Sequence, residues 1–409
     1  MGRVRKRKNG EGSYGEKTIN GILYQYYRDS NGKYTYARTS GELTKKLRKK
    51  KEEEKAKENA IISPTEDNNL YTFSQYCWYW LKIKRDTSDI TDGTYDDYES
   101  IIENRIDKFN KYDIGTKQLK SLTVDMFNNY FNALGTKYSR GSIDKVWTVI
   151  RQVLTYGIEE NHIPKILISR IKLPKERDVA VKKKNVPFIT EEDMELLYKE
   201  SLRLTSRKTS YYGNAAKVII FIMYSGLRIS EAIGLKWKHV ANDFSSITVA
   251  ESSRMIIERD SDGNAILGVD GKKKHIRIQK DPKSKDGTRA IPLPERATEI
   301  LKYFSEIPHT SEDNVFRTNN GTVFIKRNLE RVLHAMLNHS NCTNKNYTPH
   351  SLRHGYGSVL LSNGVDIKII SELLGHADIT TTYNIYIGIL KKDKINAIQN
   401  VFNKKEEPK

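Results

Sequence analysis

The chain has 409 residues, and 70 Lys and Arg against 51 Asp and Glu give it a net charge of +19. Hydrophobic residues make up 37% of the chain, enough to build real cores, which excludes a wholly disordered protein. We expect about two or three domains at this length. The longest unbroken apolar run, residues 218–224, is far shorter than the roughly 20 residues needed to span a bilayer, so no membrane-spanning helix is expected.

The cysteines and the charge indicate where the protein works and what it binds. Cys77 and Cys342 cannot form a disulfide framework, and no apolar segment follows the basic N-terminus, so we expect a cytoplasmic protein. The positive charge favours a polyanionic partner, which is either nucleic acid or an anionic surface.

Nearly half of the net charge lies in residues 1–60, which hold 17 Lys and Arg and 8 Asp and Glu. Residues 22–27 are typical of a strand, residues 29–32 (Asp-Ser-Asn-Gly) indicate a turn, and residues 34–38 resume the strand pattern. A charged helix is predicted from residue 40 to about residue 59. Because a sheet can enter the major groove, this region is a candidate DNA-binding module. The alternative is a solvated basic tail.

Apolar residues recur at helical spacing through residues 72–172, which predicts an all-helical domain. Four helices are expected there, the third over residues 122–134 and the fourth over residues 143–160. Their apolar stripes are assigned to the core of the domain. Polar sequence at residues 63–69 and Lys- and Pro-rich sequence at residues 173–187 predict linkers on either side.

The remainder of the chain alternates between helical and β-prone sequence. Thr190 is followed by three acidic residues and is predicted to cap a helix. Helices are expected up to about Trp237, a β-rich stretch over residues 247–293, and helices again from Glu295 onward. Within the β-rich stretch, residues 252–275 form a charged insertion whose role stays open.

Some patterns resemble ligand-binding motifs but lack their context. Residues 10–15 match G-x-G-x-x-G, yet basic sequence rather than a strand precedes them, so no dinucleotide site is assigned. A G-x-x-x-x-G-K-[ST] motif is absent, so nothing indicates ATP or GTP hydrolysis. The spacings of five neighbouring residues fit no common structural zinc site: His334, His339, Cys342, His350 and His354. We therefore expect no cofactor and no metal.

Cleavage of DNA without a nucleotide or a metal needs a particular set of side chains. The pentavalent transition state of a phosphodiester carries extra negative charge, which arginine suits best because its planar fork binds phosphate oxygens in pairs. Tyr is a poor nucleophile without a nearby base or cation, because its usual pKa is about 10. A general acid must also protonate the departing 5′-hydroxyl.

The C-terminal half offers these groups in order, beginning with two cationic candidates. Arg228 follows Gly226, a predicted helix stop, and Glu231 lies three residues later, where it can orient Arg228 or a neighbour. Lys283 lies in a predicted turn between two β-prone segments, and Lys285 is its competitor. A surface arginine and a solvated turn lysine are the alternative interpretations.

The later candidates lie on predicted helices. His350 and Arg353 are three residues apart on one helix, so they can meet a single phosphate. His376 emerges directly after the Leu-Leu-Gly end of the next helix. Ten residues later Tyr386 lies in a short polar helix and is the candidate nucleophile, with Tyr383 as its rival.

In this order the motifs resemble those of the tyrosine recombinases, the phage-type integrases. The resemblance is carried by G-L-R-x-S-E at Arg228, P-K-S-K at Lys283, H-x-L-R-H at His350 and Arg353, Leu-Gly-His376 and T-T-x-N-I-Tyr386. It implies a mainly α fold with α+β elements in three domains. Residues 1–62 would be an arm-type DNA-binding domain of three strands and a helix, as in integrases of conjugative transposons. Residues 70–173 would be a helical, SAM-like domain that binds the core site, and residues 185–403 a mixed α/β catalytic domain.

The resemblance also implies roles: Arg228, Arg353 and His376 hold the scissile phosphate, Lys283 protonates the leaving 5′-oxygen, His350 assists proton transfer, and Tyr386 attacks to give a 3′-phosphotyrosine. The implied activity is site-specific recombination without ATP, integrating and excising a conjugative transposon or prophage.

The implied setting is the bacterial cytoplasm, with a homotetramer on double-stranded DNA at core and arm-type sites. An excisionase and a host DNA-bending protein are implied as further partners. The alternatives are a type IB-like topoisomerase and a non-catalytic DNA-binding protein on an integrase scaffold.

Overall fold

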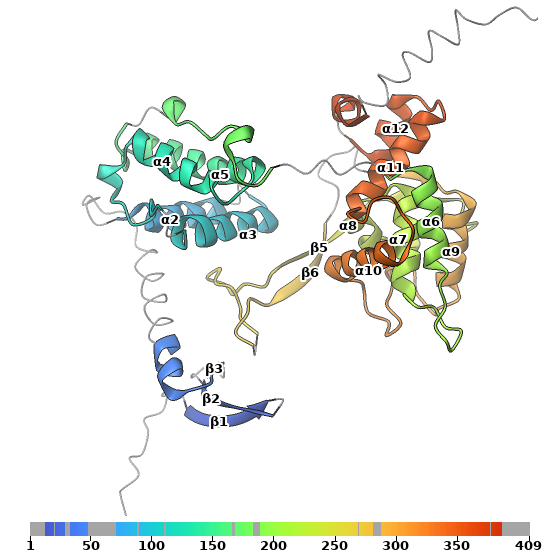
Figure 1. The fold of residues 1–409 in the computed structure, drawn as a ribbon, viewed down its shortest axis with the longest axis horizontal. Helices are drawn as coiled ribbons and strands as arrows, with labels where there is room; N and C mark the ends of the chain where they lie inside the picture. Colours follow the sequence, from blue (N-terminus) through green and yellow to red (C-terminus); the bar gives the residue numbers. More distant parts are fainter. Residues whose placement is uncertain are drawn as a thin grey trace, which may run out of the picture. The chain divides into compact units, whose positions relative to one another are not determined.

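A computed structural model of the chain describes residues 13–47 and 71–386, apart from residues 20, 29–32, 88–89, 110–111, 166–167, 183–188, 269, 281–287 and 377. The chain forms two compact units, whose elements are labelled in Figure 1. Unit 1 comprises Met1–Lys184 and Ile256–Ile276, and unit 2 comprises Asn185–Met255 and Arg277–Lys409. Helices predominate and the sheets are small, so the predicted fold class is confirmed. Among the described residues, no helix has both the length and the apolar character of a membrane span.

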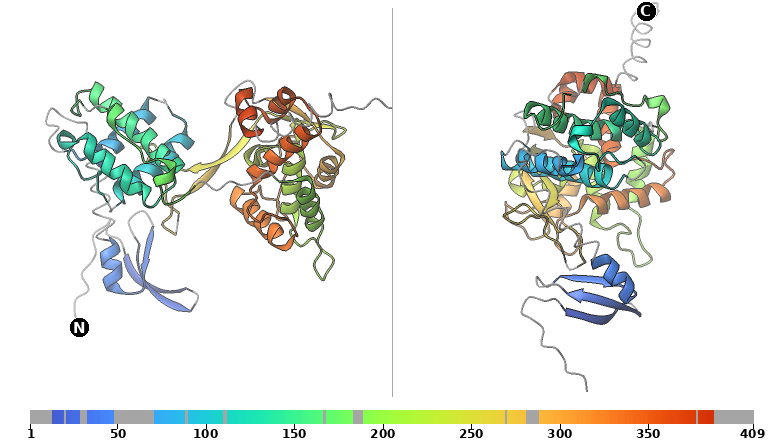
Figure 2. Two further views of the ribbon diagram at one scale, coloured as in Figure 1. Left: turned by 45° about the horizontal axis from the view of Figure 1, so that its top comes forward. Right: turned by 90° about the vertical axis from the view of Figure 1, so that its left-hand side faces the viewer.

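Unit 1 begins with a three-stranded antiparallel sheet in the order β1 (Ser13–Ile19), β2 (Ile22–Arg28) and β3 (Tyr34–Ala37). A helix starts at residue 40, and Figure 2 shows it against the sheet, where Leu43 and Ala37 are buried. Because side chains alternate along a strand, the rings of Tyr26, Tyr34 and Tyr36 lie on the face opposite to Ala37, with centroids no more than 5.9 Å apart.

The structure describes this helix to residue 47, so the rest of its predicted length and the predicted turn at residues 29–32 lie outside the described residues. Gly15, the last glycine of the G-x-G-x-x-G match, is in the middle of β1 and pairs with Tyr26. A Cβ atom at this position would lie 2.6 Å from the Tyr26 hydroxyl oxygen. The glycine therefore makes room for a tyrosine ring.

The predicted all-helical region is confirmed in the second part of unit 1. Its elements are α2 (Phe73–Asp86), α3 (Asp92–Ile101), the π-helix η2 (Ile102–Asp107), η3 (Leu119–Ser121), α4 (Val124–Gly135), α5 (Arg140–Glu159), η4 (Ile168–Arg170) and η5 (Glu176–Asp178). Their apolar stripes meet in one core, in which Phe73, Trp80, Phe127 and Ile150 are fully buried.

Two predicted helix starts differ from the structure because the capping residues decide them. The helix predicted over residues 122–134 begins at Val124, since the Thr123 side chain accepts a hydrogen bond from the backbone N–H of Met126. The helix predicted over residues 143–160 begins three residues earlier, after Ser139, whose hydroxyl accepts from the N–H of Ser142.

The charged insertion packs in unit 1, although the chain on both sides of it belongs to unit 2. The guanidinium of Arg259 pairs with Asp96 at 2.6 Å and with Glu99 at 3.1 Å, and it lies 4.4 Å from the ring centre of Tyr95. Lys273 adds a 2.8 Å ion pair with Glu99. Arg259 and Lys273 thus hold the charged insertion on an acidic surface of α3.

Unit 2 is built around α7 (Asn214–Ser225), whose residues 218–223 are all at most 1% exposed. A helix that is apolar all round must be covered on every side. In Figure 1 its neighbours include α6 (Glu191–Ser201), α9 (Glu295–Ser305), α10 (Lys326–His339) and α11 (Pro349–Ser362). The unit also contains α8 (Ile229–Gly234), the short η6 (Trp237–His239) and α12 (Ile367–Leu374), which packs on α11.

The predicted cap of α6 is confirmed, because the Thr190 side chain accepts from the N–H of Asp193. The β-rich stretch forms two strand pairs: β4 (Ser246–Val249) lies antiparallel to β7 (Arg289–Pro292), and β5 (Ser252–Ile257) pairs with β6 (His275–Lys280). Strand β7 brings Arg289 close to the end of α12, next to the predicted site residues.

Candidate active site

Arg228 lies at the junction of α7 and α8, as predicted. Gly226 ends α7 with a φ of 65°, a left-handed conformation that favours glycine, and the chain turns there so that Arg228 caps α8. Glu231 orients Arg228 through two hydrogen bonds, at 2.9 Å from the backbone N–H and 2.7 Å from Nη1. The Nη2 of Arg228 donates to the carbonyl oxygen of Gly375 at 3.2 Å.

Arg353 is fully buried on α11 beside Arg228. Its Nη1 donates to the carbonyl oxygen of Gly226 at 2.8 Å, and its Nη2 donates to that of Leu374. The Nε of Arg353 has no hydrogen-bond partner within the described part of the chain. Burial and the charge of Arg228 lower the pKa of Arg353 to about 9, which leaves it charged at neutral pH.

Arg289 is a member of the cluster that the sequence analysis missed. Its Nη2 lies 2.9 Å from Glu231, and its Nε donates to the carbonyl oxygen of Leu373 at 2.7 Å. Burial alone would raise the pKa of Glu231, but the hydrogen bond from Arg289 and the charges of Arg353 and Arg228 lower it below its usual range. Glu231 is therefore a carboxylate shared by three arginines. In the sequence, the only local feature that marked Arg289 was its position two residues before the I-P-L strand.

His376 follows Gly375, which ends α12 with a φ of 63°. Its Nδ1 lies 2.8 Å from the hydroxyl of Thr382, a fully buried residue that the sequence analysis also missed. Burial and the charges of Arg353 and Arg228 lower the pKa of His376 to about 4, so the ring is neutral at neutral pH. A Thr382 hydroxyl that donates to Nδ1 leaves the ring proton on Nε2.

The two other histidines of the region lie on α11. His350 is exposed, and its ring centre lies 4.2 Å from that of His354. Desolvation and the charge of Arg353 lower the pKa of His350. Desolvation, reinforced by His350, lowers the pKa of His354 to about 4. His350 and Arg353 thus share a helix as predicted, but only His350 reaches the surface.

Tyr386 is the last described residue of a helix that starts at residue 379, and it is fully buried. Its hydroxyl donates to the carbonyl oxygen of His354 at 3.2 Å. Burial raises its pKa well above the usual value, against the opposing charge of Arg353. The rival Tyr383 is 42% exposed, on the outside of the same helix. Tyr386 therefore lies against α11, the helix that carries Arg353, whereas Tyr383 faces outward.

Lys283 and its competitor Lys285 lie outside the described residues. Within the described chain, no group of three or more His, Cys, Asp or Glu is arranged to hold a metal ion.

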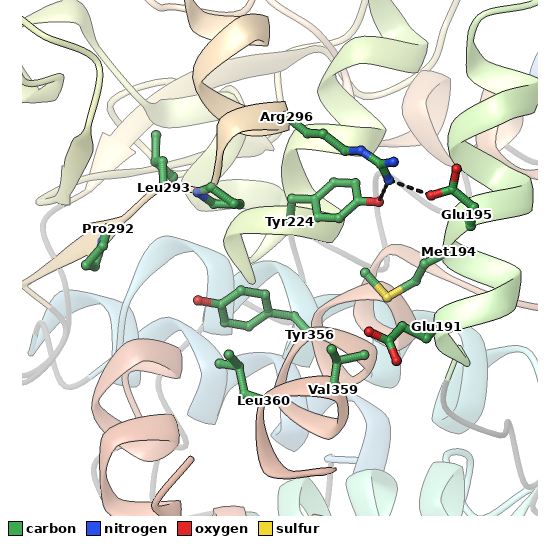
Figure 3. A pocket seen from close by; sticks show the side chains of 11 residues that line it. Glu191, Met194, Glu195, Tyr224, Pro292, Leu293, Arg296, Tyr356, Val359 and Leu360 are labelled. Atoms are coloured by element: carbon green, nitrogen blue, oxygen red, sulfur yellow. Dashed lines mark hydrogen bonds and ion pairs between the residues drawn. The ribbon is translucent and has the colours of Figure 1, made fainter. Parts of the chain in front are cut away.

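A hollow of about 550 Å³ lies apart from the cluster, between α6, α11 and the segment that joins β7 to α9. Its walls are mostly apolar, including Met194, Leu293, Tyr356 and Val359. In its lining, Figure 3 shows the carboxylate of Glu191 and also Arg296, which binds Glu195 at 2.7 Å and the Tyr224 hydroxyl. None of the predicted site residues lines this hollow.

Part of this cluster lies in a segment that is similar to a known protein family. The sequence model of the phage integrase family matches residues 265–392, which include His350, Arg353, His376 and Tyr386. The chain is 25% identical to a XerC-like tyrosine recombinase of Caldanaerobacter subterraneus over 398 residues, 91% of this chain and 93% of that protein. It is 38% identical to the tyrosine recombinase XerD of Listeria monocytogenes over 113 residues, 26% of this chain and 37% of that protein.

Two solved structures share the fold. One is the Tn1549 transposon integrase in complex with a circular intermediate DNA, at a TM-score of 0.60 and 18% identity, covering 76% of this chain and 94% of that one. The other is a lambda integrase dimer bound to a COC′ core site, at a TM-score of 0.53 and 15% identity, covering 94% of this chain and 96% of that one. These likenesses lead to one conclusion: the chain has the fold of these integrases, its residues 265–392 match the phage integrase family, and most of its length is similar to a tyrosine recombinase.

Proposed function

We propose that this protein is a site-specific recombinase that cuts and rejoins DNA through a 3′-phosphotyrosine on Tyr386. The observation that carries the proposal is that Arg228 and Arg353 both bind the turn before His376, with one buried Arg353 donor left without a hydrogen-bond partner in the described residues. Tyr386 binds the backbone of His354, the residue after Arg353. An unsatisfied donor on a buried cation is costly and is expected where an anionic group binds.

The geometry suits in-line displacement at phosphorus. Arg228 and Arg353 supply fixed positive charge, and the Nε2–H of neutral His376 supplies a further donor to a non-bridging oxygen. Both arginines would exchange their backbone carbonyl partners for phosphate oxygens. The buried Tyr386 hydroxyl would leave the His354 carbonyl to reach the phosphorus atom, which requires the helix over residues 379–386 to move.

In the proposed step the Tyr386 oxygen bonds to phosphorus while the bond from phosphorus to the 5′-oxygen breaks. His350, neutral and exposed, receives the tyrosine proton, and Lys283 gives a proton to the leaving 5′-oxygen. The phosphodiester energy is kept in the phosphotyrosine, so a new 5′-hydroxyl can reverse the step without ATP.

For the biological role, we propose integration and excision of a mobile element, a conjugative transposon or prophage. The support is the tyrosine-rich sheet of unit 1, a candidate reader of arm-type sites, which a topoisomerase that relaxes DNA as a monomer would not need. Strand exchange between two duplexes needs four active sites, hence a tetramer on DNA. The three expected parts of the chain, residues 1–62, 70–173 and 185–403, then serve as arm-site reader, core-site reader and catalytic domain.

The test uses a duplex with a nick near the scissile phosphate, carrying a site recovered by sequencing DNA bound to the Tyr386→Phe variant. We expect the wild-type protein to be trapped on this duplex as an adduct stable to detergent. The reaction should proceed in EDTA, since arginine and histidine side chains stabilise the charge. A cleavage that stops on chelation and returns with magnesium would refute the mechanism.

A further inference from the structure

Arg289 joins two sides of the arginine cluster that are far apart in the sequence. On one side its Nη1 and Nη2 lie 3.3 Å and 2.9 Å from the two carboxylate oxygens of Glu231 on α8. On the other side its Nε donates to the carbonyl oxygen of Leu373 in the last turn of α12. Arg289 itself is 9% exposed, so these contacts are made away from bulk water.

Each side leads directly to a predicted site residue. Glu231 orients Arg228 through its side chain and its backbone N–H. The last turn of α12 ends at Gly375, which accepts a hydrogen bond from Arg228 and precedes His376. A Cβ atom at Gly375 would lie 2.7 Å from Nη1 of Arg289, so the turn packs directly on this guanidinium.

The ion pair between Arg289 and Glu231 also affects the net charge of the cluster. Three guanidinium groups, those of Arg228, Arg289 and Arg353, surround the single carboxylate of Glu231, so the cluster keeps a net charge of +2. A phosphodiester transition state carries about two negative charges once a phenolate has joined the monoanionic diester. Without Arg289, Glu231 would offset half of the charge that Arg228 and Arg353 supply, at a site where burial strengthens every Coulomb interaction.

We propose that Arg289 is a positioning residue for strand cleavage, which holds Glu231 and the turn before His376 so that Arg228 and Arg353 keep their full charge for the phosphate. This inference rests on the proposed function. It assigns Arg289 no contact with DNA, and its effect reaches the phosphate through its neighbours.

A plain structural ion pair is the competing explanation, since breaking a buried pair destabilises a protein by about 3–5 kcal/mol. The charge of the substrate separates the two. A methylphosphonate at the scissile position replaces one charged oxygen by a methyl group, so its transition state needs less positive charge. A variant that lacks only positive charge is slowed more on the ordinary phosphate than on the methylphosphonate. A variant whose only defect is a smaller fraction of folded protein is slowed equally on both substrates.

The experiment measures single-turnover adduct formation by the full chain on both nicked duplexes, with protein in excess. We expect Arg289→Gln to slow cleavage of the ordinary phosphate by about 10- to 100-fold. This is less than the roughly 10²- to 10³-fold loss of rate when a donor that contacts the transition state directly is removed. Cleavage of the methylphosphonate should slow less than about threefold. Arg289→Lys, which keeps the charge but not the paired donors, should lie between wild type and Arg289→Gln.

Arg296→Gln is the matched control, because it removes another ion-paired arginine of unit 2 that lies outside the cluster. It should leave the ratio of the two rates at the wild-type value. If Arg289→Gln does not fold, as judged from its thermal transition, the ratio is taken from Arg289→Met, which also removes the charge but places an apolar side chain in the buried position. If Arg289→Gln slows cleavage equally on both substrates, or does not slow it at all, the inference about Arg289 is wrong. The proposed function still stands in that case, provided that the wild-type protein forms its adduct. A wild-type protein without an adduct on Tyr386 overturns both.

Discussion

The hydroxyl of Tyr386 donates a hydrogen bond to the backbone carbonyl of His354, on the same helix as Arg353. The ring is fully buried, and burial raises its pKa. In this arrangement the phenol is protonated and shielded, close to the arginines but not presented to a phosphate from outside. The hydroxyl of the proposed nucleophile is thus buried in this structure and must move before it can reach a phosphate.

The first prediction follows from the different burial of two tyrosines on one helix. Tyr386→Phe removes only the hydroxyl, so DNA binding should stay within about twofold of wild type while the covalent adduct disappears. Tyr383→Phe, on the exposed side of that helix, is the matched control and should form the adduct at the wild-type rate. Gel analysis of the nicked duplex in detergent measures both. An adduct lost only in Tyr383→Phe would show that the nucleophile is misassigned.

The second prediction concerns the close packing of Tyr386 on α11. A Cβ atom at Gly357 would lie 2.1 Å from the Tyr386 hydroxyl oxygen, so Gly357→Ala must displace the tyrosine or the helix. We expect a destabilisation of about 1–3 kcal/mol, typical of overpacking, seen as a lower thermal midpoint. Gly141→Ala is the control, because nothing lies within 4 Å of a Cβ atom there. An unchanged midpoint for Gly357→Ala would contradict the buried position of Tyr386.

The third prediction is a loss of stability on mild acidification. Burial lowers the pKa of His354 and of His376 to about 4, whereas an unfolded histidine titrates near 6.5. Between these values the unfolded chain binds protons that the folded chain does not. Stability is therefore complete above about pH 6.5 and falls as the pH drops toward 4, by up to about 1.4 kcal/mol per pH unit for each histidine.

Thermal midpoints at pH 5 and pH 7.5 test this. We expect His376→Asn to reduce the drop in thermal midpoint between pH 7.5 and pH 5. The control is His334→Asn, at an exposed position on α10, which should leave this drop unchanged. A His376→Asn variant with the same loss as wild type would mean that His376 is not held neutral in the folded protein.

The fourth prediction concerns the insertion in unit 1. Glu99 is 6% exposed and binds both Arg259 and Lys273, so Glu99→Gln leaves two cations facing each other with less compensation. We expect a cost of about 3 kcal/mol or more, as for other broken buried pairs, and faster tryptic cleavage between residues 256 and 276. Glu258→Gln is the control, since its partner Lys274 is 54% exposed, such pairs contribute about 0–1 kcal/mol, and the change leaves every tryptic site in place. Similar cleavage rates for the two variants would contradict this packing.

These contacts show which parts of the molecule the sequence could predict. Helix ends depend on neighbouring residues, so the cap at Thr190 and the stop at Gly226 were correctly predicted from short motifs. The contact between Arg228 and the turn before His376 was accessible only through motif order, because it joins segments more than a hundred residues apart.

What the sequence could not reveal are long-range polar pairings. Arg289 and Thr382 carry no periodicity or local partner that marks them, and only the fold brings them to Glu231 and His376. The insertion was recognised by its charge, but its acidic partner surface lies about 160 residues earlier in the chain. Charge complementarity between such distant segments has no local signature.

The last prediction concerns the three-stranded sheet at the start of unit 1. Residues 1–60 carry 17 Lys and Arg against 8 Asp and Glu, and the rings of Tyr26, Tyr34 and Tyr36 share one face of the sheet. If this face reads DNA, deleting residues 1–62 should leave cleavage of a short core-site duplex intact, because the arginine cluster lies wholly in unit 2.

Binding to a longer duplex with accessory sites should weaken in the deletion variant, because one of two tethered contacts is lost. The salt dependence of binding should also become shallower, since fewer phosphates are neutralised. Footprinting then distinguishes a reader from a basic tail, because a reader protects a second discrete site that disappears with the deletion. A tail would add affinity everywhere and protect no such site. A wild-type footprint confined to the core site would therefore remove the arm-binding assignment and leave the recombinase assignment standing.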